Sequence, residues 1–537
     1  MFSFAILIGV YGYLLFALGL ANILYKDQII IMSLAYLLLI SLYYRKIIFD
    51  YFTQLKLPVL SLSFLRESGN YFIILLVLFI ALVFLNLIGA MVPELAFDAL
   101  WYHLTIPKIY LLNHSIFYIP GNLLYYSAMP RLGEMLYILP LAFYGEILAK
   151  MVHLLFGLFT SLTIYKLSRK YFDKTVSILA VVIFYSNLVV SWQSTTAYVD
   201  LIRSFFELIA LWGFINWWET KNKQWLVESG VILGLAISTK IIAVFSLLIF
   251  FILIIFKNKG LFKKSIGEMF ILGITALIIV IPWFIFAYIY TENPVFPIFT
   301  NLAPSFNLSL LGNPFRIVLG VFALFTSSAD PISPIYLILL PLIVISFKKL
   351  KMITKLMLGY SLIALLTIFL IPTTDQARFY MPYLPAFSIV IASAITIVKN
   401  KSKQAIVGLI VLLAIISFFY RLAASYKYFP YILQQESREK FLSAKLNFSF
   451  GDFYDTDGFF AKKVKKDQKV LLYGFHNLYY VDFPFTDSSW VKKGDRFNYV
   501  AVQGGVAPDR FKNWNLIYTN NKTDVKVYSL GGVEWIY

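Results

Sequence analysis

Long apolar runs recur along this chain of 537 residues, and they restrict its fold more than any other feature of the sequence. A helix needs about 20 apolar residues to cross the hydrocarbon core of a bilayer, and roughly thirteen runs are long enough, two of them short or broken. The sequence therefore predicts an all-α polytopic membrane protein. The expected spans lie near residues 3–24, 28–44, 70–91, 145–165, 174–193, 199–218, 225–238, 239–256, 268–290, 332–347, 355–371, 378–398 and 404–423.

The composition agrees with a membrane protein, because 60% of the residues are hydrophobic, only 14% are charged and the mean hydropathy is +0.77. Ordinary soluble domains are far more polar. The net charge of +18 could indicate nucleic-acid binding, but Lys and Arg fall into short clusters between the apolar runs, as membrane orientation requires. We therefore expect no nucleic-acid partner. The absence of cysteine excludes disulfides and thiolate sites.

The basic clusters occupy alternate connections between the expected spans, and such connections face the cytoplasm. The intervening loops, which include residues 92–144 and 291–331, hold few Lys or Arg residues. We therefore expect these loops, and the whole segment after Arg421, to be extracytoplasmic in a multi-pass protein of the plasma membrane. The cytoplasmic clusters lie at residues 45–66, 166–174, 221–223, 257–264, 348–355 and 399–403.

The final segment, residues 424–537, has no spanning run and contains short strand-like stretches separated by turns. It is expected to form a small extracytoplasmic α/β domain, after two additional N-terminal spans and a cytoplasmic loop in residues 1–69 and a membrane core in residues 70–423. Its expected strands lie near 469–474, 497–502, 515–518 and 525–528, and its expected helices near 430–446 and 456–465.

Two ionisable side chains follow the third apolar run, in the outer segment FDALWYH at residues 97–103. Asp98 is a candidate general base, because partial desolvation among aromatic residues can raise the basicity of a carboxylate. It could equally cap the helix that follows. His103 is a second acid–base candidate, although a loop histidine more often serves only as a hydrogen-bonding residue.

A second carboxylate, Asp200, begins a later helix at its outer end, where a negative charge suits the helix dipole. A functional role would require Asp200 to meet Asp98 in space, which sequence spacing does not show. Arg203 lies about one turn further along and could instead pair with Asp200, which would explain both charges without chemistry.

Two cations lie at the outer ends of spans, where the phosphate of a lipid would sit. Lys240 and Arg378 could each neutralise a departing phosphate there. The alternative for both is that the side chain extends to the headgroup layer without a further role. Asp375 could also be an ordinary ion-pair partner of Arg378.

Taken together, these features resemble the GT-C glycosyltransferases, a polytopic superfamily that includes protein mannosyltransferases and aminoarabinose transferases. The resemblance rests on the FDALWYH loop, the later Asp200, a Pro-rich outer loop and the R-F-Y-x-P-x-x-P segment at 378–385. It covers most of residues 70–423. Many members carry an acidic pair in the first outer loop, where this chain has Asp98 followed by Ala99.

The resemblance implies a glycosyltransferase that moves a hexosyl or pentosyl group from a polyprenyl-phosphate donor to a lipid, glycan or protein acceptor, with inversion. Asp98 would take the proton from the acceptor, with Asp200 and His103 as further catalytic residues. Arg378, Lys240 and Lys108 would bind the donor phosphate. No cluster of ligands requires a metal, and no cofactor is expected. A lipid or solute transporter or flippase, and a non-catalytic scaffold, are the alternatives.

Overall fold

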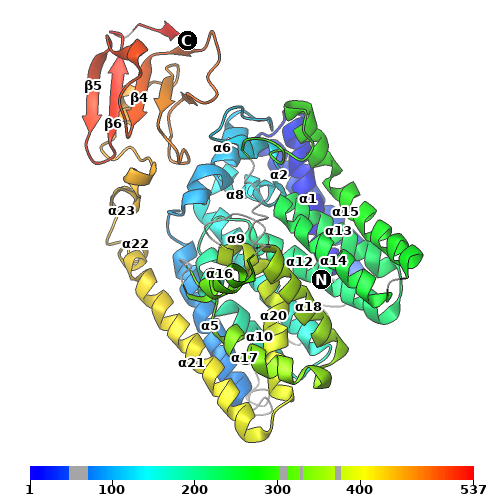
Figure 1. Ribbon diagram of the computed structural model, residues 1–537. Helices are drawn as coiled ribbons and strands as arrows, with labels where there is room; N and C mark the ends of the chain where they lie inside the picture. Colours follow the sequence, from blue (N-terminus) through cyan, green and yellow to red (C-terminus); the bar gives the residue numbers. More distant parts are fainter. Residues whose placement is uncertain (47–69, 260, 303–312, 327–329, 369–375, 532) are drawn as a thin grey trace.

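The structure is a computed structural model, and it describes residues 1–46, 70–259, 261–302, 313–326, 330–368, 376–531 and 533–537. Most of the chain is helical, with a small sheet domain at the C-terminal end (Figure 1). The helices of the membrane part are α1 (Phe2–Leu20), α2 (Lys26–Tyr43), α5 (Asn70–Ala90), α9 (Glu146–Arg169), α10 (Lys174–Tyr185), α11 (Leu188–Gln193), α12 (Asp200–Thr220), α13 (Gln224–Thr239), α14 (Val244–Lys257), α15 (Phe262–Thr291), α16 (Pro314–Thr326), α17 (Ile335–Ile345), α18 (Met352–Ile368), α19 (Gln376–Tyr380), α20 (Leu384–Ser393) and α21 (Asn400–Ser425).

Within the described residues, every expected span coincides with one of these helices or with a consecutive set of helices and short helical turns, so the prediction of a polytopic helical membrane protein is confirmed; residues 369–371 of the expected span 355–371 lie outside the described residues. Within the described residues, seven helical segments are long and apolar enough to cross a bilayer. Other helices, such as α10 and α17, are shorter than a full span. The expected number of roughly thirteen spans is therefore not established by helix length.

The packing of α13 on α15 fixes one wall of the bundle. Gly230 and Gly234 form a G-x-x-x-G face on α13, and a Cβ atom on either would come within 2.7 Å of a carbonyl oxygen of α15. Glycine at both positions therefore lets the two helix backbones approach closely, as small residues do in membrane helix pairs. Because α13 ends at Thr239, this contact also fixes the position of Lys240.

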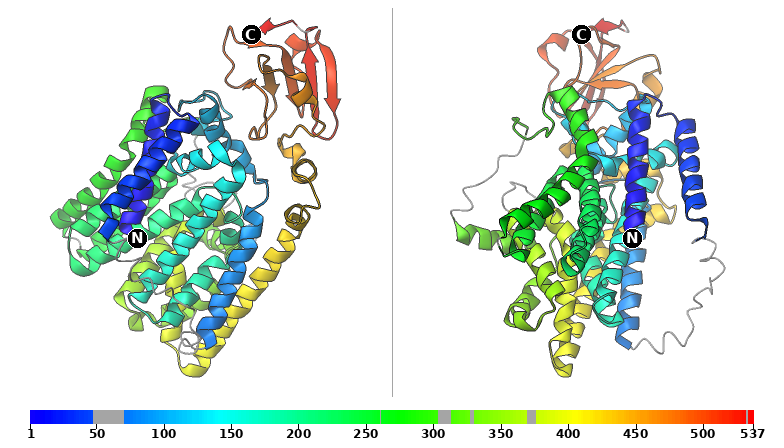
Figure 2. Two further views of the ribbon diagram at one scale, coloured as in Figure 1. Left: turned by 180° about the vertical axis from the view of Figure 1, so that it is seen from behind. Right: turned by 90° about the vertical axis from the view of Figure 1, so that its right-hand side faces the viewer.

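The two N-terminal helices differ in how they join the bundle. Figure 2 shows α1 against the bundle, where it contacts α13, and α2 on the outer side of α1. On the opposite flank, α5 and α21 run side by side (Figure 1).

The segment at residues 92–144, predicted only as a loop, folds into several short helices. Many of its apolar residues, such as Tyr110 and Met135, are fully buried, so much of the segment packs as part of the protein core. The elements are the π-helical turn η1 (Ala99–His103), α6 (Thr105–Leu112), the 3₁₀ turn η2 (Tyr125–Ala128), α7 (Leu132–Met135) and α8 (Ile138–Phe143).

The C-terminal domain is α/β, as predicted, with a five-stranded sheet in the order β2-β1-β4-β6-β5. Strand β1 (Val470–Tyr473) is parallel to both of its neighbours, β2 (Phe485–Asp487) and the central strand β4 (Tyr499–Gln503). The sheet continues antiparallel through β6 (Val525–Ser529) to β5 (Asn515–Asn520), and β3 (Arg496–Phe497) pairs separately with β7 (Trp535–Ile536). Strands as short as β2, β3 and β7 give little sequence signal. The expected helix at 430–446 is divided into α22 (Phe429–Ile432) and α23 (Arg438–Lys445), and α24 (Phe459–Lys463) follows.

Polar contacts join this domain to the segment at residues 92–144. The Nζ atom of Lys108 donates to the carbonyl oxygen of Tyr479 at 2.6 Å and to the carboxylate of Asp482 at 2.6 Å. The Tyr480 hydroxyl donates to the carbonyl oxygen of Glu94 at 2.9 Å. The C-terminal domain therefore sits directly on the loop that carries Asp98, at one end of the bundle (Figures 1 and 2).

Candidate active site

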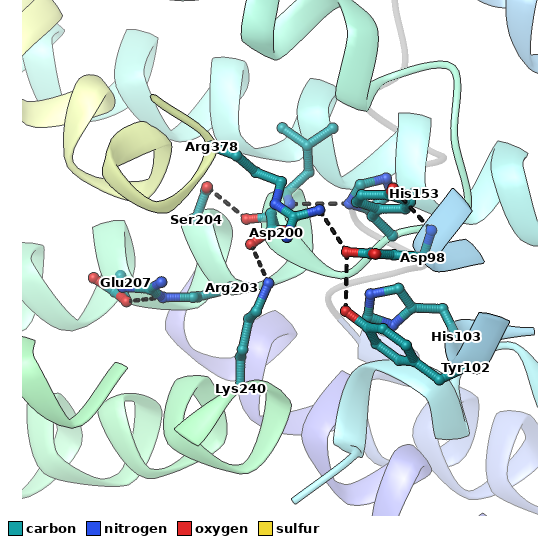
Figure 3. A network of polar contacts seen from close by, with 12 residues as sticks. Asp98, Tyr102, His103, His153, Asp200, Arg203, Ser204, Glu207, Lys240 and Arg378 are labelled. Carbon is teal, nitrogen blue, oxygen red and sulfur yellow. Dashed lines mark hydrogen bonds and ion pairs between the residues drawn. The ribbon is translucent and has the colours of Figure 1, made fainter. Parts of the chain in front are cut away.

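Four elements bring charged side chains together in one cluster (Figure 3), close to the contact between Phe97 and His476 of the C-terminal domain. The loop after α5 carries Asp98, and α12 begins at Asp200. Lys240 immediately follows α13, and α19 carries Arg378. The two carboxylates that the sequence could not place relative to each other therefore meet in one cluster, together with two of the three predicted cations.

Asp98 is held by an ion pair with Arg378. The Nη1 atom of Arg378 donates to Oδ2 of Asp98 at 2.6 Å, and the Tyr102 hydroxyl donates to the same oxygen at 3.1 Å. The two charged side chains are only 12% and 16% exposed. The Asp98 side chain makes no capping hydrogen bond to η1, so capping does not account for this residue.

The ion pair also decides the acidity of Asp98. Burial favours the neutral form, but the Arg378 guanidinium outweighs it and holds the pKa of Asp98 below its ordinary value. The expectation that desolvation makes Asp98 a stronger base is therefore wrong for this ion-paired arrangement. Asp375, the alternative partner of Arg378, lies outside the described residues.

Asp200 forms a second ion pair next to the first. The Nζ atom of Lys240 donates to Oδ1 of Asp200 at 2.8 Å, and the Asp200 side chain is fully buried. Lys240 also lies 5.0 Å from the ring of Phe379, the neighbour of Arg378. The suggestion that Arg203 neutralises Asp200 is wrong, because Arg203 pairs with Glu207 at 2.5 Å, further along α12.

His103 lies in the same cluster, on a buried network that the sequence analysis did not identify. Its Nδ1 atom is 2.9 Å from Oε1 of Glu134, which also accepts from Nη1 of Arg131 at 3.1 Å. All three side chains are buried. The spacing of Arg131 and Glu134, three residues apart in an apolar segment, is the sequence signal that could have pointed to this pair.

The structure does not bring Lys108 to this cluster. Its ammonium group contacts the C-terminal domain, where Val481 provides a third acceptor at 2.9 Å besides Tyr479 and Asp482. A different residue, His153 on α9, lies beside Asp200, and its Nε2 atom accepts from the backbone N–H of Leu201 at 3.0 Å (Figure 3). Nothing in the sequence around His153 distinguished it from other core residues.

Within the described part of the chain, no group of three or more His, Asp or Glu side chains lies close enough together to hold a metal ion. The chemistry available to the described site is that of two carboxylates, two cations and an imidazole. Such a set can hold an anionic leaving group and move a proton.

Comparison with known proteins identifies the fold. Residues 141–286 match the family model of dolichyl-phosphate-mannose-protein mannosyltransferase, a segment that includes Asp200 and Lys240. The structure is similar to ArnT from Cupriavidus metallidurans bound to undecaprenyl phosphate, with a TM-score of 0.55 and 13% identity, over 84% of this chain and 97% of that chain. The chain therefore has the fold of ArnT, a GT-C membrane glycosyltransferase.

Two further solved structures are similar to this chain. The apo state of ArnT from the same organism matches with a TM-score of 0.52 and 12% identity, over 84% of this chain and 97% of that chain. The Archaeoglobus fulgidus oligosaccharyltransferase matches with a TM-score of 0.43 and 13% identity, over 80% of this chain and 68% of that chain. None of the curated proteins matches this chain.

Proposed function

We propose that this GT-C protein transfers a sugar from a polyprenyl-phosphate donor to an acceptor on the extracytoplasmic side, with inversion and with Asp98 as the general base. The observation that carries the proposal is the pair of adjacent ion pairs, Asp98 with Arg378 and Asp200 with Lys240. A buried carboxylate, a part-buried carboxylate and two cations at one end of a helical bundle can act on both partners of a group transfer.

The cations are suited to the donor phosphate. Arg378 offers a planar guanidinium, which binds phosphate oxygens in pairs, and Lys240 adds a compact second charge. Each cation is neutralised by a carboxylate in the structure. A phosphate that enters would compete with these carboxylates for the same donors. The similar ArnT structure was solved with undecaprenyl phosphate bound, which supports a lipid phosphate as the ligand.

This competition would couple donor binding to base strength. Arg378 is the main reason that the pKa of Asp98 lies below its ordinary value, while burial alone raises it. When a phosphate draws Arg378 away, Asp98 loses that stabilising charge and becomes a stronger base. The base would thus gain strength only once the donor is in place.

The reaction itself is a single displacement. The acceptor hydroxyl or amine gives its proton to Asp98, and its oxygen or nitrogen bonds to the anomeric carbon of the sugar. The bond between that carbon and the phosphate oxygen breaks, and its electron pair leaves with the polyprenyl phosphate, which Arg378 and Lys240 stabilise. Attack opposite the leaving group inverts the anomeric centre.

The outward orientation rests on the placement of charge. The loop with Asp98 and the C-terminal domain lie at the same end of the bundle, and the loop is poor in basic residues. Connections rich in Lys and Arg, such as residues 257–264 and 348–355, alternate with it along the chain.

The test is a donor screen with the purified full-length protein in detergent, using polyprenyl-phosphate sugars with a radiolabelled sugar and mixed lipid, glycan and peptide acceptors. Transfer of the label, identified by mass spectrometry, supports the proposal. Lipid flux into vesicles without group transfer would favour the transporter instead. Glu219→Gln is a matched control, because Glu219 forms its own ion pair with Lys170 at the opposite end of α12 from Asp200.

A further inference from the structure

Two buried histidines flank the Asp98–Asp200 cluster, and only one of them has both ring nitrogens satisfied. His153 on α9 uses Nδ1 toward the carbonyl oxygens of Gln193 and Thr196, at 2.9 and 2.8 Å. Its Nε2 atom accepts from the backbone N–H of Leu201 at 3.0 Å. His153 is therefore a fully paired neutral imidazole with its proton on Nδ1.

In His103, only the Nδ1 atom has a hydrogen-bond partner. Its Nδ1 atom faces Oε1 of Glu134 at 2.9 Å, and a carboxylate can only accept, so the proton of the neutral ring lies on Nδ1. Its Nε2 atom is buried and has no hydrogen-bond partner among the described residues. Since buried polar atoms are nearly always paired, an unpaired acceptor inside a site indicates a missing hydrogen donor.

Glu134 is itself held in place as an anion. Burial raises the pKa of its carboxyl, but Arg131 outweighs burial and leaves the pKa below the ordinary value. Arg131 reaches Glu134 with Nη1 at 3.1 Å, while its Nε atom donates to the carbonyl oxygen of Tyr126 at 2.6 Å. The carboxylate is thus fixed against Nδ1 of His103, and the tautomer follows from it.

His103 also stands beside the base that the displacement uses. Its ring centroid lies 4.3 Å from that of Tyr102, whose hydroxyl donates to Asp98, and Figure 3 places its ring next to the Asp98 carboxylate. The charged and titratable groups around the ring are Asp98, Tyr102, Arg131, Glu134, His153, Tyr198, Asp200 and Lys240.

We infer that Nε2 of His103 receives the proton that Asp98 takes from the acceptor, with Glu134 and Arg131 as positioning residues. This inference rests on the proposed function. The O–H bond on Asp98 breaks and an N–H bond forms on Nε2, so the carboxylate is regenerated to pair again with Arg378. The resulting imidazolium is stabilised by Glu134, and solvent removes the proton before the next turnover.

The first test needs no substrate. The chain contains only four histidines, so ¹⁵N-histidine labelling of the full-length protein gives four imidazole signal sets, and His103→Asn assigns one of them. Burial lowers the pKa of His103, so its ring is expected to be neutral at pH 7, with a protonated Nδ1 and an unprotonated Nε2. The signals of His153 provide an internal reference, because its hydrogen bonds fix a neutral ring with the proton on Nδ1. A His103 ring protonated on Nε2 at pH 7 would overturn the inference, whatever the activity.

The second test uses the donor that the screen identifies. His103→Asn should lower kcat by about 100-fold, as for loss of an acid–base group. Glu134→Gln removes the charge that raises the pKa of His103. The acid limb of the rate profile should therefore move down by about one pH unit, while kcat falls. If kcat falls but the acid limb stays at the same pH, Glu134 has only a structural role, which contradicts the inference. Failure of the donor screen would refute the proposed function, while the tautomer measurement would still decide the geometry.

Discussion

Arg378 and Asp98 are 280 positions apart in the sequence, and their side chains meet at 2.6 Å. One residue belongs to the loop after α5 and the other to α19, so this contact closes the site across the bundle. The same contact sets the pKa of Asp98 below its ordinary value. In the proposed function, Arg378 would therefore act on the donor and on the base together.

Replacing Arg378 should change both donor use and pH dependence. Arg378→Ala removes a phosphate ligand, so we expect the KM for the donor to rise by at least about tenfold, with a smaller effect on the KM for the acceptor. It also removes the charge that lowers the pKa of Asp98, so the limb of the rate profile due to Asp98, which is separate from the limb due to His103, should move to higher pH. Arg378→Lys, which keeps the charge, should move this limb less. Equal effects on donor and acceptor would remove the phosphate role.

The Asp200–Lys240 pair predicts a strong coupling between two substitutions. Lys240→Met leaves the fully buried Asp200 without its partner, and breaking a buried pair costs about 3–5 kcal/mol. The double variant Asp200→Asn with Lys240→Met removes both charges and should recover much of this stability. It should remain inactive, because a phosphate ligand is lost. Thermal unfolding in detergent and the transfer assay together measure this, and additive losses of stability would count against the pairing.

The close contact between α13 and α15 predicts an unequal response of two glycines. Gly234→Leu forces a side chain against the carbonyl oxygen of Ala276, and we expect a loss of about 1–3 kcal/mol in the free energy of unfolding. We also expect lower transfer activity, because a shift of α13 would displace Lys240, which follows it. Gly408→Leu on α21 is the matched control, since a Cβ there meets no atom within 4 Å among the described residues. Equal unfolding temperatures for the two variants would show that the α13–α15 contact does not hold the site.

The absence of cysteine makes the orientation directly measurable. A single cysteine at the exposed Lys522, in the turn between β5 and β6, should react with a membrane-impermeant maleimide in intact cells. A single cysteine at the exposed Lys259, in the connection after α14, should react only after the cells are permeabilised. The reverse pattern would place the site on the cytoplasmic side.

The sequence predicted most of the fold because span length and strand alternation are local properties. Helices such as α5 and α15 follow from apolar runs alone, and β1, β4 and β6 follow from short β-branched or apolar stretches. The loop at 92–144 was predicted less well, since its short helices are stabilised by burial in the assembled core rather than by length.

The site residues were predicted individually, but their partners were not. Local spacing suggested Arg203 for Asp200, whereas the chain folds so that Lys240, 40 positions away, takes that place. Glu134 was missed for the same reason, because its contact with His103 joins α7 to η1 across 31 positions. Pairing between distant segments depends on how the helices pack, and sequence spacing carries no information about that packing.

The most direct measurement is transfer by Asp98→Asn with the donor identified in the screen. Asparagine keeps the size of the side chain but cannot take a proton, so kcat should fall by about 100-fold to 10,000-fold while the protein stays folded and inserted. Glu219→Gln should retain wild-type turnover in the same assay. Turnover by purified Asp98→Asn close to that of the wild type would contradict the assignment of Asp98 as the base.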